Sequence, residues 1–302
     1  MRTPKYLLVV AVLIALFATA CTHADGNFQK NFAVTETPDV EIDNSTGNIT
    51  VRTGDVNSVQ VTATVEAFAL SPDLLVERIE KDPPLTQSGN HIRIGRGRDY
   101  SGPFQQAEIN YTVTVPPATR LTSSLGTGNQ EFSGIQGRLS ATTGTGDVRL
   151  SGYMGDARVR IGTGNIDAEH VDGTVTFEIG TGSAQLHNSK ASRAEVIIGT
   201  GDMTLEFVQG DLRARTGTGN ISINGFPTNP WRVDTGTGNI SLRTDPKSAY
   251  RLEAHGEIGQ VNLGSEAQNV HNDEDHRSVF ADVGNGGPRV ELTTGTGSID
   301  IN

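Results

Sequence analysis

Cysteine is almost absent from this sequence: the 302 residues contain one, Cys21. No disulfide can therefore cross-link the chain beyond that position, and the fold has to be held together by packing and hydrogen bonds. A single thiol is also unusual in an exported protein, because oxidising compartments favour paired cysteines. Cys21 therefore needs a role other than disulfide formation.

Basic residues are outnumbered, with 24 Lys and Arg against 35 Asp and Glu. Residues 1–20 contain Arg2 and Lys5 and no acid, so the remaining chain has 24 − 2 = 22 basic and 35 acidic residues, a formal charge of −13. A surface with this charge repels nucleic acid and anionic lipid. We expect no nucleic-acid partner.

Familiar catalytic signatures are also missing. The sequence has no Gly-x-Ser-x-Gly, no His-Glu-x-x-His, no phosphate-binding Gly-Lys-Ser/Thr loop and no cysteine placed as a nucleophile. The segment His271–His276 holds ligand-type side chains, but we interpret it as a solvated acidic loop, and Gly95–Arg98 as a small basic loop. The sequence predicts no enzyme, no catalytic residue, no cofactor and no metal site.

The apolar run near the N-terminus is too short to span a membrane. Tyr6–Ala20 gives 15 uncharged residues behind Arg2 and Lys5, whereas a spanning helix needs ~20. A charged start followed by a short apolar run is typical of a secretory signal. We predict that residues 1–20 are a signal peptide.

Cys21 stands at the expected cleavage point of that signal, behind Thr19 and Ala20. Here the chain resembles bacterial lipoproteins, although Ala18 replaces the leucine usual in their signals. The resemblance implies acylation of Cys21, a lipidated tether over 21–32 that contains His23, and a membrane-anchored location in the bacterial cell envelope. Thr22 in the second position favours the outer membrane. An ordinary signal followed by an incidental cysteine is the alternative.

Glycine is abundant, with 36 residues, and much of it is periodic. The tripeptide Gly-Thr-Gly starts at residues 126, 144, 162, 180, 199, 217, 236 and 295, which sets a repeat of 18 or 19 residues. So short a repeat cannot bury its own apolar face, so it must form one coil of a solenoid. We predict an all-β, parallel β-helix-like solenoid, favour a right-handed coil, and place a single domain over 33–302.

Each coil contains two segments of alternating polarity. Counting the first glycine of the tripeptide as position 1, positions 5 and 7 are apolar, as in Ile166 and Ala168, and positions 14, 16 and 18 form a second apolar set, as in Val175, Phe177 and Ile179. Alternation with period two predicts strands with one buried face. Each coil should therefore supply one strand to each of two sheets.

Two positions at the turn are expected to form ladders from coil to coil, spaced by ~4.8 Å. Counting in twos from position 18 places the threonine inside, so we predict that Thr163 and Thr181 are buried. Position 4 holds amides, carboxylates and hydroxyls that can bond the neighbouring backbone. The predicted ladder residues are Thr127, Thr145, Thr163, Thr181, Thr200, Thr218, Thr237 and Thr296, and Asn129, Asp147, Asn165, Ser183, Asp202, Asn220, Asn239 and Ser298.

Two other solenoids of this coil length do not fit the pattern. A hexapeptide helix needs an aliphatic residue every six positions, but stepping from Ile161 reaches Asp167 and then Gly173. Calcium-binding nonapeptide rolls need an aspartate in every half-coil. Position 4 holds a carboxylate only at Asp147 and Asp202, which are ~14 Å apart by strand spacing.

The ends of the domain differ from its regular middle at 121–245. N-terminal coils over 33–120 include a helical insert at 72–81, behind Ser71 as cap, which we expect to cover the first coils. The C-terminal part, 246–302, is expected to contain coils with an acidic loop at 265–278, and the gap from residue 236 to 295 fits three coils carrying a loop. Ile299 and Ile301 then lie on an open edge, so either that loop folds over them or the end pairs with another chain.

A family resemblance covers nearly the whole chain beyond the signal. It rests on the Ser45–Val51 corner, the helical insert, the Ile109–Pro117 strand with its closing Val-Pro, and the serial Gly-Thr-Gly coils. In these features the chain resembles the bacterial β-strand-repeat putative adhesins, a family of unknown function. The resemblance implies a β-helical domain on exported, often membrane-attached proteins, and no catalytic residues.

The sequence thus favours a non-enzymatic cell-envelope lipoprotein, adhesin-like or a scaffold, that binds an envelope protein, a glycan or a second copy of itself. The alternative is a polysaccharide-acting lyase or hydrolase, because carboxylates on neighbouring coils come within the ~5–10 Å that glycosidases use. Coils of 18 residues leave little chain to wall a cleft, which favours the first reading.

Overall fold

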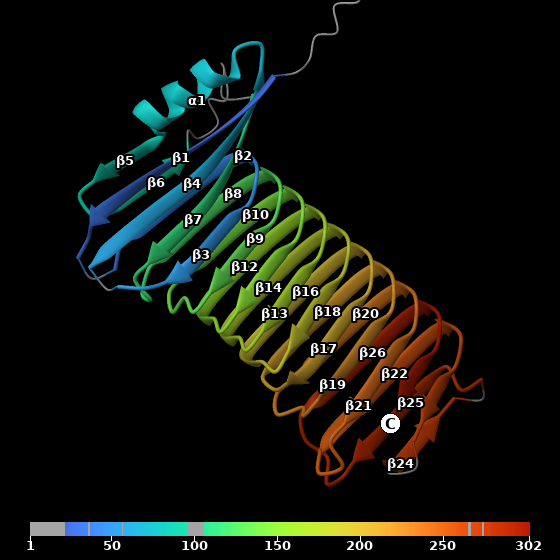
Figure 1. The fold of residues 1–302 in the computed structure, drawn as a ribbon. Helices are drawn as coiled ribbons and strands as arrows, with labels where there is room; N and C mark the ends of the chain where they lie inside the picture. Colours follow the sequence, from blue (N-terminus) through green and yellow to red (C-terminus); the bar gives the residue numbers. More distant parts are fainter. Residues whose placement is uncertain (1–21, 36, 56, 96–105, 265–266, 274) are drawn as a thin grey trace, which may run out of the picture.

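The computed structural model describes residues 22–35, 37–55, 57–95, 106–264, 267–273 and 275–302. The predicted signal and Cys21 lie outside these residues. Within them the chain winds into a stack of coils that forms two long, largely parallel sheets, with one short helix at the N-terminal end (Figure 1). The protein is therefore mostly β, as predicted, and has the architecture of a β-solenoid.

The two sheets, here called sheet A and sheet B, lie face to face. Sheet A contains, in spatial order, β1 (Thr22–Ala33), β4 (Ser58–Ala69), β7 (Ala107–Val115), β3 (Ile49–Thr53), β9 (Gln130–Ser133), β11 (Val148–Ser151), β13 (Ile166–Glu169), β15 (Ala184–His187), β17 (Met203–Val208), β19 (Ile221–Gly225), β21 (Ile240–Thr244), β27 (Ile299–Ile301) and β23 (Val261–Leu263). Sheet B contains β24 (Ala267–Asn272), β25 (Ser278–Val283), β22 (Tyr250–Ile258), β26 (Arg289–Thr296), β20 (Trp231–Thr237), β18 (Asp211–Thr218), β16 (Lys190–Thr200), β14 (Asp172–Thr181), β12 (Met154–Thr163), β10 (Leu139–Thr145), β8 (Arg120–Thr127), β2 (Asp39–Thr46), β6 (His91–Gly95) and β5 (Leu85–Ser88).

Alternation along each strand fills the space between the sheets. Val159 and Phe177 are fully buried and stand side by side in β12 and β14, while Arg158 and Arg160 face outward. Positions 5 and 7 supply the opposing layer, for example Ile166. The predicted strand periodicity is therefore confirmed, and each fully buried aliphatic side chain contributes about 1.5–3 kcal/mol.

The corner threonines are in register but not buried, so this prediction is wrong. Thr163 pairs with Thr181, yet both are exposed. Two consecutive residues, Gly162 and Thr163, both face outward. The alternation of buried and exposed residues therefore shifts at this pair and not after the threonine. Glycine permits this, and the threonine ladder lies on the outside of the turn.

The turn glycines act in two different ways. Gly164 has φ of +141°, a conformation that L side chains rarely adopt. Gly162 has no positive φ, but a Cβ there would lie 2.6 Å from the carbonyl oxygen of Gly144 in the preceding coil. Close approach of neighbouring backbones therefore requires glycine at the first position, and backbone conformation requires it at the third.

The N-terminal segment is a strand and not a tether. β1 pairs antiparallel with β4 along its whole length and buries Phe28 and Phe32. The predicted helix is confirmed as α1 (Pro72–Lys81), which begins after Ser71 without a side-chain cap and buries Leu75, Val76 and Ile79. Strand and helix together extend and cover the first coils.

The C-terminal end also differs from its prediction. β27 lies between β21 and β23, and β26 lies between β20 and β22, so the last coil is inserted between two earlier ones. Along the chain, two coils rather than the predicted three lie between residues 236 and 295. In space the two turns are direct neighbours, because Thr237 pairs with Thr296. Most of the segment predicted as an acidic loop is an antiparallel hairpin, β24 and β25, which ends sheet B. Ile299 and Ile301 are buried, so the open edge predicted there does not exist.

Candidate functional site

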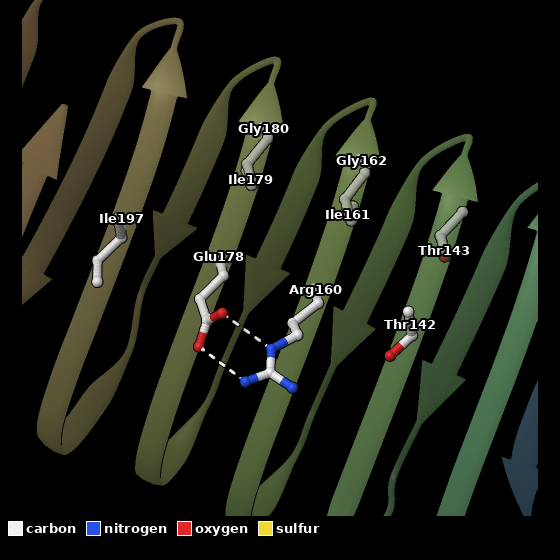
Figure 2. Close-up of a pocket in the computed structure, with 9 residues that line it drawn as sticks. All are labelled: Thr142, Thr143, Arg160, Ile161, Gly162, Glu178, Ile179, Gly180 and Ile197. Atoms are coloured by element: carbon white, nitrogen blue, oxygen red, sulfur yellow. Dashed lines mark hydrogen bonds and ion pairs between the residues drawn. The ribbon is translucent and has the colours of Figure 1, made fainter. Parts of the chain in front are cut away.

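The outer face of sheet B presents a row of arginines and carboxylates. Its side chains alternate with the buried ones along each strand and therefore face outward. Glu178 on β14 accepts hydrogen bonds from Arg158 Nη2 at 2.6 Å and from Arg160 Nε at 2.8 Å, both on the neighbouring β12. Figure 2 shows the two-point contact between Arg160 and Glu178.

Similar pairs continue along the sheet from coil to coil. They are Arg193–Asp211 at 3.2 Å, Arg215–Asp234 at 3.2 Å, Arg232–Asp234 at 3.2 Å, Arg232–Glu291 at 3.5 Å, and Arg289–Glu253. Exposed pairs of this kind add little stability, because solvent screens them. Each guanidinium has five N–H donors, and its carboxylate takes one or two of them. The row can therefore offer hydrogen-bond donors from several strands to a ligand that lies along the sheet.

A shallow hollow of about 400 Å³ lies over this face. Its lining residues are Thr142, Thr143, Arg160, Ile161, Gly162, Glu178, Ile179, Gly180 and Ile197 (Figure 2). Apolar surface from Ile197 and the glycines stands beside a charged pair and threonine hydroxyls. This combination suits contact with a sugar ring or a peptide and supplies no reactive group.

Glu178 is not suited to proton donation at neutral pH. The hydrogen bond from Arg160 lowers the pKa of this carboxyl, and the second arginine, Arg158, lowers it further. A glycosidase general acid needs the opposite, a raised pKa. Glu178 is therefore a fixed anion that orients two guanidinium groups.

The position-4 residues form a ladder of hydrogen bonds from coil to coil. Asn129 Oδ1 accepts from the backbone N–H of Asp147 at 2.9 Å, Asp147 Oδ1 from that of Asn165 at 2.8 Å, and Asn165 Oδ1 from that of Ser183 at 2.9 Å. A second run leads from Asp202 through Asn220 and Asn239 to Ser298. These residues hold the turns together, so their role is structural.

The eight corner threonines stand beside that ladder on the outside of the turns. Thr127, Thr145, Thr163, Thr181, Thr200, Thr218, Thr237 and Thr296 are all exposed and pair in register along the solenoid. Their hydroxyls and methyl groups form a regular stripe near the hollow over sheet B.

The histidine-rich C-terminal segment does not gather into a site in the described residues. His271 and Asn272 end β24, and Asp273 Oδ1 accepts hydrogen bonds from the backbone N–H groups of Arg277 at 2.6 Å and Ser278 at 3.1 Å. The Ser278 backbone bond is the largest cause of a lowered pKa at Asp273. Asp273 shapes the turn before β25.

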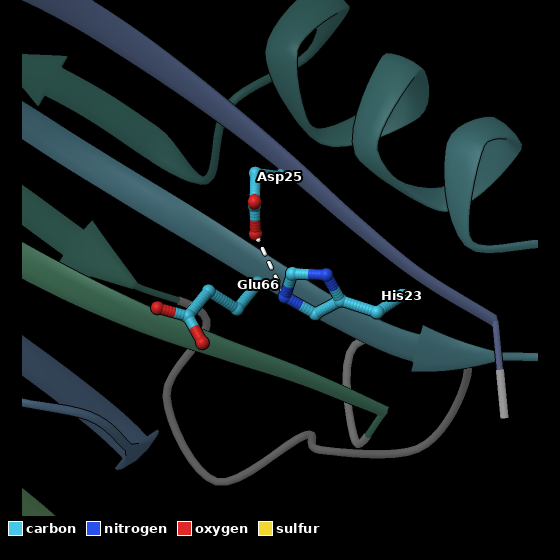
Figure 3. A group of neighbouring side chains, drawn as sticks. All are labelled: His23, Asp25 and Glu66. Carbon is cyan, nitrogen blue, oxygen red and sulfur yellow. Dashed lines mark ion pairs between the residues drawn. The ribbon is translucent and has the colours of Figure 1, made fainter.

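A different group of ligand-type side chains meets on the outer face of sheet A. His23 and Asp25 on β1 and Glu66 on β4 bring their ligand atoms within 4.8 Å of one another, and His23 Nε2 lies 2.9 Å from Asp25 Oδ1 (Figure 3). Imidazole and carboxylate together suit a divalent transition metal. His23 and Asp25 are exposed, Glu66 is half-buried, and His23 and Asp25 already satisfy each other.

Sequence reasoning missed this cluster because it placed His23 in a tether. Antiparallel pairing of β1 with β4 sets Asp25 directly opposite Glu66, and no local pattern reports so distant a pairing. The alternation of His23, Asp25 and Asn27 is a weak strand signal that could have been followed.

Comparison with known proteins places the chain in a family. A family model described as Toastrack DUF4097 matches residues 38–302. No curated protein matches the sequence. Across the described residues no helix combines the length and apolar character needed to cross a bilayer.

Several solved structures are similar to this chain at low sequence identity. A putative adhesin from Parabacteroides distasonis ATCC 8503 is 11% identical, with 92% of this chain and 97% of that chain covered and a TM-score of 0.38. A putative adhesin from Bacteroides fragilis NCTC 9343 is 10% identical, with 92% and 97% covered and a TM-score of 0.37. A putative lipid binding protein from Parabacteroides distasonis ATCC 8503 is 10% identical, with 91% and 96% covered and a TM-score of 0.41.

Proposed function

The chain belongs to the Toastrack DUF4097 family, and we propose that it is a non-enzymatic cell-envelope lipoprotein that binds an envelope protein or glycan. The outer face of sheet B is the binding surface in this proposal. The observation that carries it is the row of paired arginines and carboxylates that continues from β12 to β26 beside the shallow hollow.

The extended shape of this row argues for an extended ligand. Its donors come from β12, β16, β18, β20 and β26 and lie on a sheet rather than around a pocket. A polymer or a strand of another protein can contact several coils at once, and many weak contacts then add to a useful affinity. A small molecule would touch only one or two coils.

Membrane attachment rests on the N-terminal sequence. An acylated Cys21 would directly precede Thr22, where β1 begins. Each buried CH₂ of an acyl chain contributes about 0.8 kcal/mol, so two or three chains hold a protein on a bilayer without help from the polypeptide. We propose the outer membrane, facing the periplasm, as the location.

The structure offers little support for a polysaccharide-acting enzyme as the alternative. The turns of the 18- and 19-residue coils are short, and those next to the hollow do not extend into loops that would border a cleft. Its carboxylate, Glu178, is held by two arginines and kept ionised. Binding of a glycan at this face therefore fits the observed chemistry better than its cleavage.

A capture experiment tests the binding surface. Tagged full-length protein is used to isolate partners from cross-linked cell envelopes, for the wild type and for Arg158→Glu with Arg160→Glu. Arg149→Glu on the outer face of sheet A is the control, because it also breaks one exposed pair, with Asp167. We expect the sheet B variant to lose partners that the wild type and the control retain. Equal capture by all three would exclude sheet B as the site.

Substitution of Cys21 tests the anchor separately. Cys21→Ser should leave the protein unprocessed or release it from washed membranes, because no acyl chain can then be attached. Wild-type protein in the soluble fraction after lysis would refute the anchor, whatever the result of the capture experiment.

A further inference from the structure

Three large apolar side chains are exposed within seven residues of one another at the N-terminal end of the fold. Phe68 is 49% exposed, Leu70 95% and Leu74 64%. They follow one another from the end of β4 into the first turn of α1. Single exposed apolar residues are common, but such a concentration marks an interaction surface. We call these three residues the apolar corner.

The apolar corner does not belong to the core. The inward face of α1 uses Leu75, Val76 and Ile79, all buried, whereas Leu74 lies outside that set. Phe68 lies on the outer face of sheet A, with its ring 5.3 Å from that of His23. A hollow of about 250 Å³ opens beside Leu70 and Leu74 and includes the side of Arg78.

The start of the described chain lies at the same place. Thr22, the first residue of β1, pairs with Ala69, and His23 pairs with Phe68. Residue 22, at the beginning of β1, therefore lies beside the end of β4, and α1 begins three residues after Ala69. In the sequence Cys21 directly precedes Thr22, and the uncharged run Tyr6–Ala20 precedes Cys21.

We propose that the apolar corner inserts into the bilayer surface beside the acylated Cys21, so that the domain is docked on the membrane and not merely tethered to it. The inference rests on the proposed lipid anchor. An anchor with no spacer keeps Phe68, Leu70 and Leu74 at a high local concentration near the lipid, where weak apolar contacts suffice.

The polar side chains near the corner are placed compatibly with this contact. Asp25 and Glu66 face each other on β1 and β4. Along these strands they lie two residues away from the neighbouring pair, His23 and Phe68. Both carboxylates lie within 4.8 Å of a ring nitrogen of His23, so this polar group marks the boundary of the apolar corner. Arg78 beside the hollow can reach lipid phosphates.

Docking at this corner fixes which part of the solenoid is near the membrane. The capped N-terminal coils would lie against the lipid, and the β24–β25 hairpin lies at the opposite end of the stack (Figure 1). The outer face of sheet B would then extend away from the bilayer.

Fluorescence quenching tests the contact. Full-length acylated Leu70→Cys is labelled with a polarity-sensitive thiol-reactive dye and reconstituted into phosphatidylethanolamine and phosphatidylglycerol vesicles that contain a spin-labelled lipid. Met154→Cys is the control, because Met154 is exposed in the middle of the solenoid. We expect quenching at position 70 to exceed that at 154 several-fold. Equal quenching at both positions overturns the docking.

Two further arms separate this inference from the anchor. Wild-type protein treated with the dye should stay unlabelled, because Cys21 is acylated; labelling at Cys21 would refute the anchor itself. Adding Leu74→Asp to the labelled Leu70→Cys protein should at least halve its quenching, whereas Ile258→Asp, at another exposed position, should leave it unchanged. Quenching that survives Leu74→Asp overturns the apolar contact as its cause.

Discussion

The side chain of Asn165 accepts, through Oδ1, a 2.9 Å hydrogen bond from the backbone N–H of Ser183, its counterpart in the next coil. The same turn is also bonded to the preceding coil, because the backbone N–H of Asn165 donates to Asp147 Oδ1 at 2.8 Å. Within each of the two runs, one side chain per coil thus satisfies a turn N–H of its neighbour. These bonds complete the hydrogen bonding of the turns, where the sheets alone would leave donors unpaired.

Loss of one ladder member should therefore destabilise the domain. We expect Asn165→Ala to lower the free energy of unfolding by about 0.5–1.5 kcal/mol, because the N–H of Ser183 loses its acceptor. Thr163→Ala, two residues earlier and exposed, should cost less than about 0.5 kcal/mol. Urea unfolding followed by circular dichroism measures both. Equal losses would mean that the threonine stripe, not the ladder, holds the turns.

The first glycine of the corner should not tolerate a side chain. Gly162→Ala is expected to cost about 1–3 kcal/mol, because its Cβ would lie 2.6 Å from the Gly144 carbonyl oxygen. Gly256→Ala is the matched control: its nearest neighbour, Thr294 Cγ2, would be at 3.5 Å, an ordinary contact, so the change should be near neutral. Chemical denaturation of the two variants decides, and a neutral Gly162→Ala would remove the steric account.

Tyr153 should make the protein sensitive to alkaline pH. Burial raises the pKa of its hydroxyl, which lies 2.8 Å from the Asp156 carbonyl oxygen and also contacts that of Gly137. A raised folded-state pKa stabilises the fold below the unfolded value of about 10, and this contribution is lost as the pH rises above it. Tyr153→Phe should cost about 1 kcal/mol at pH 7 but show a smaller further loss above pH 10 in melting curves. Identical pH profiles for both proteins would contradict this role.

The C-terminal coil should be part of the core and not a dimer interface. Ile299 is fully buried between β21 and β23, so Ile299→Lys should unfold the domain or lower its stability by more than about 3 kcal/mol. Ile258→Lys, at a position 66% exposed, should leave stability nearly unchanged. Thermal melting and light scattering test both variants. A folded Ile299→Lys protein whose only change is loss of a dimer would restore the open-edge model.

The sequence predicted most of the regular fold because its repeat is short and strict. Alternation at positions 14, 16 and 18 and at positions 5 and 7 determines which residues are buried. A period of 18 or 19 residues then stacks equivalent residues of successive coils on one another. The position-4 ladder followed from chemistry alone, since an amide or carboxylate repeated at the strand spacing meets the next backbone N–H.

The tertiary structure decided what local patterns do not contain. A single-residue shift at Gly162 placed Thr163 outside, although counting from Ile161 placed it inside. The order of the last coils and the pairing of β1 with β4 depend on long-range contacts, which determined that Ile299 is covered and that Thr22 lies beside Ala69. Periodicity therefore determined how each coil packs, but only competition among distant backbone partners could determine how the two ends of the stack are closed.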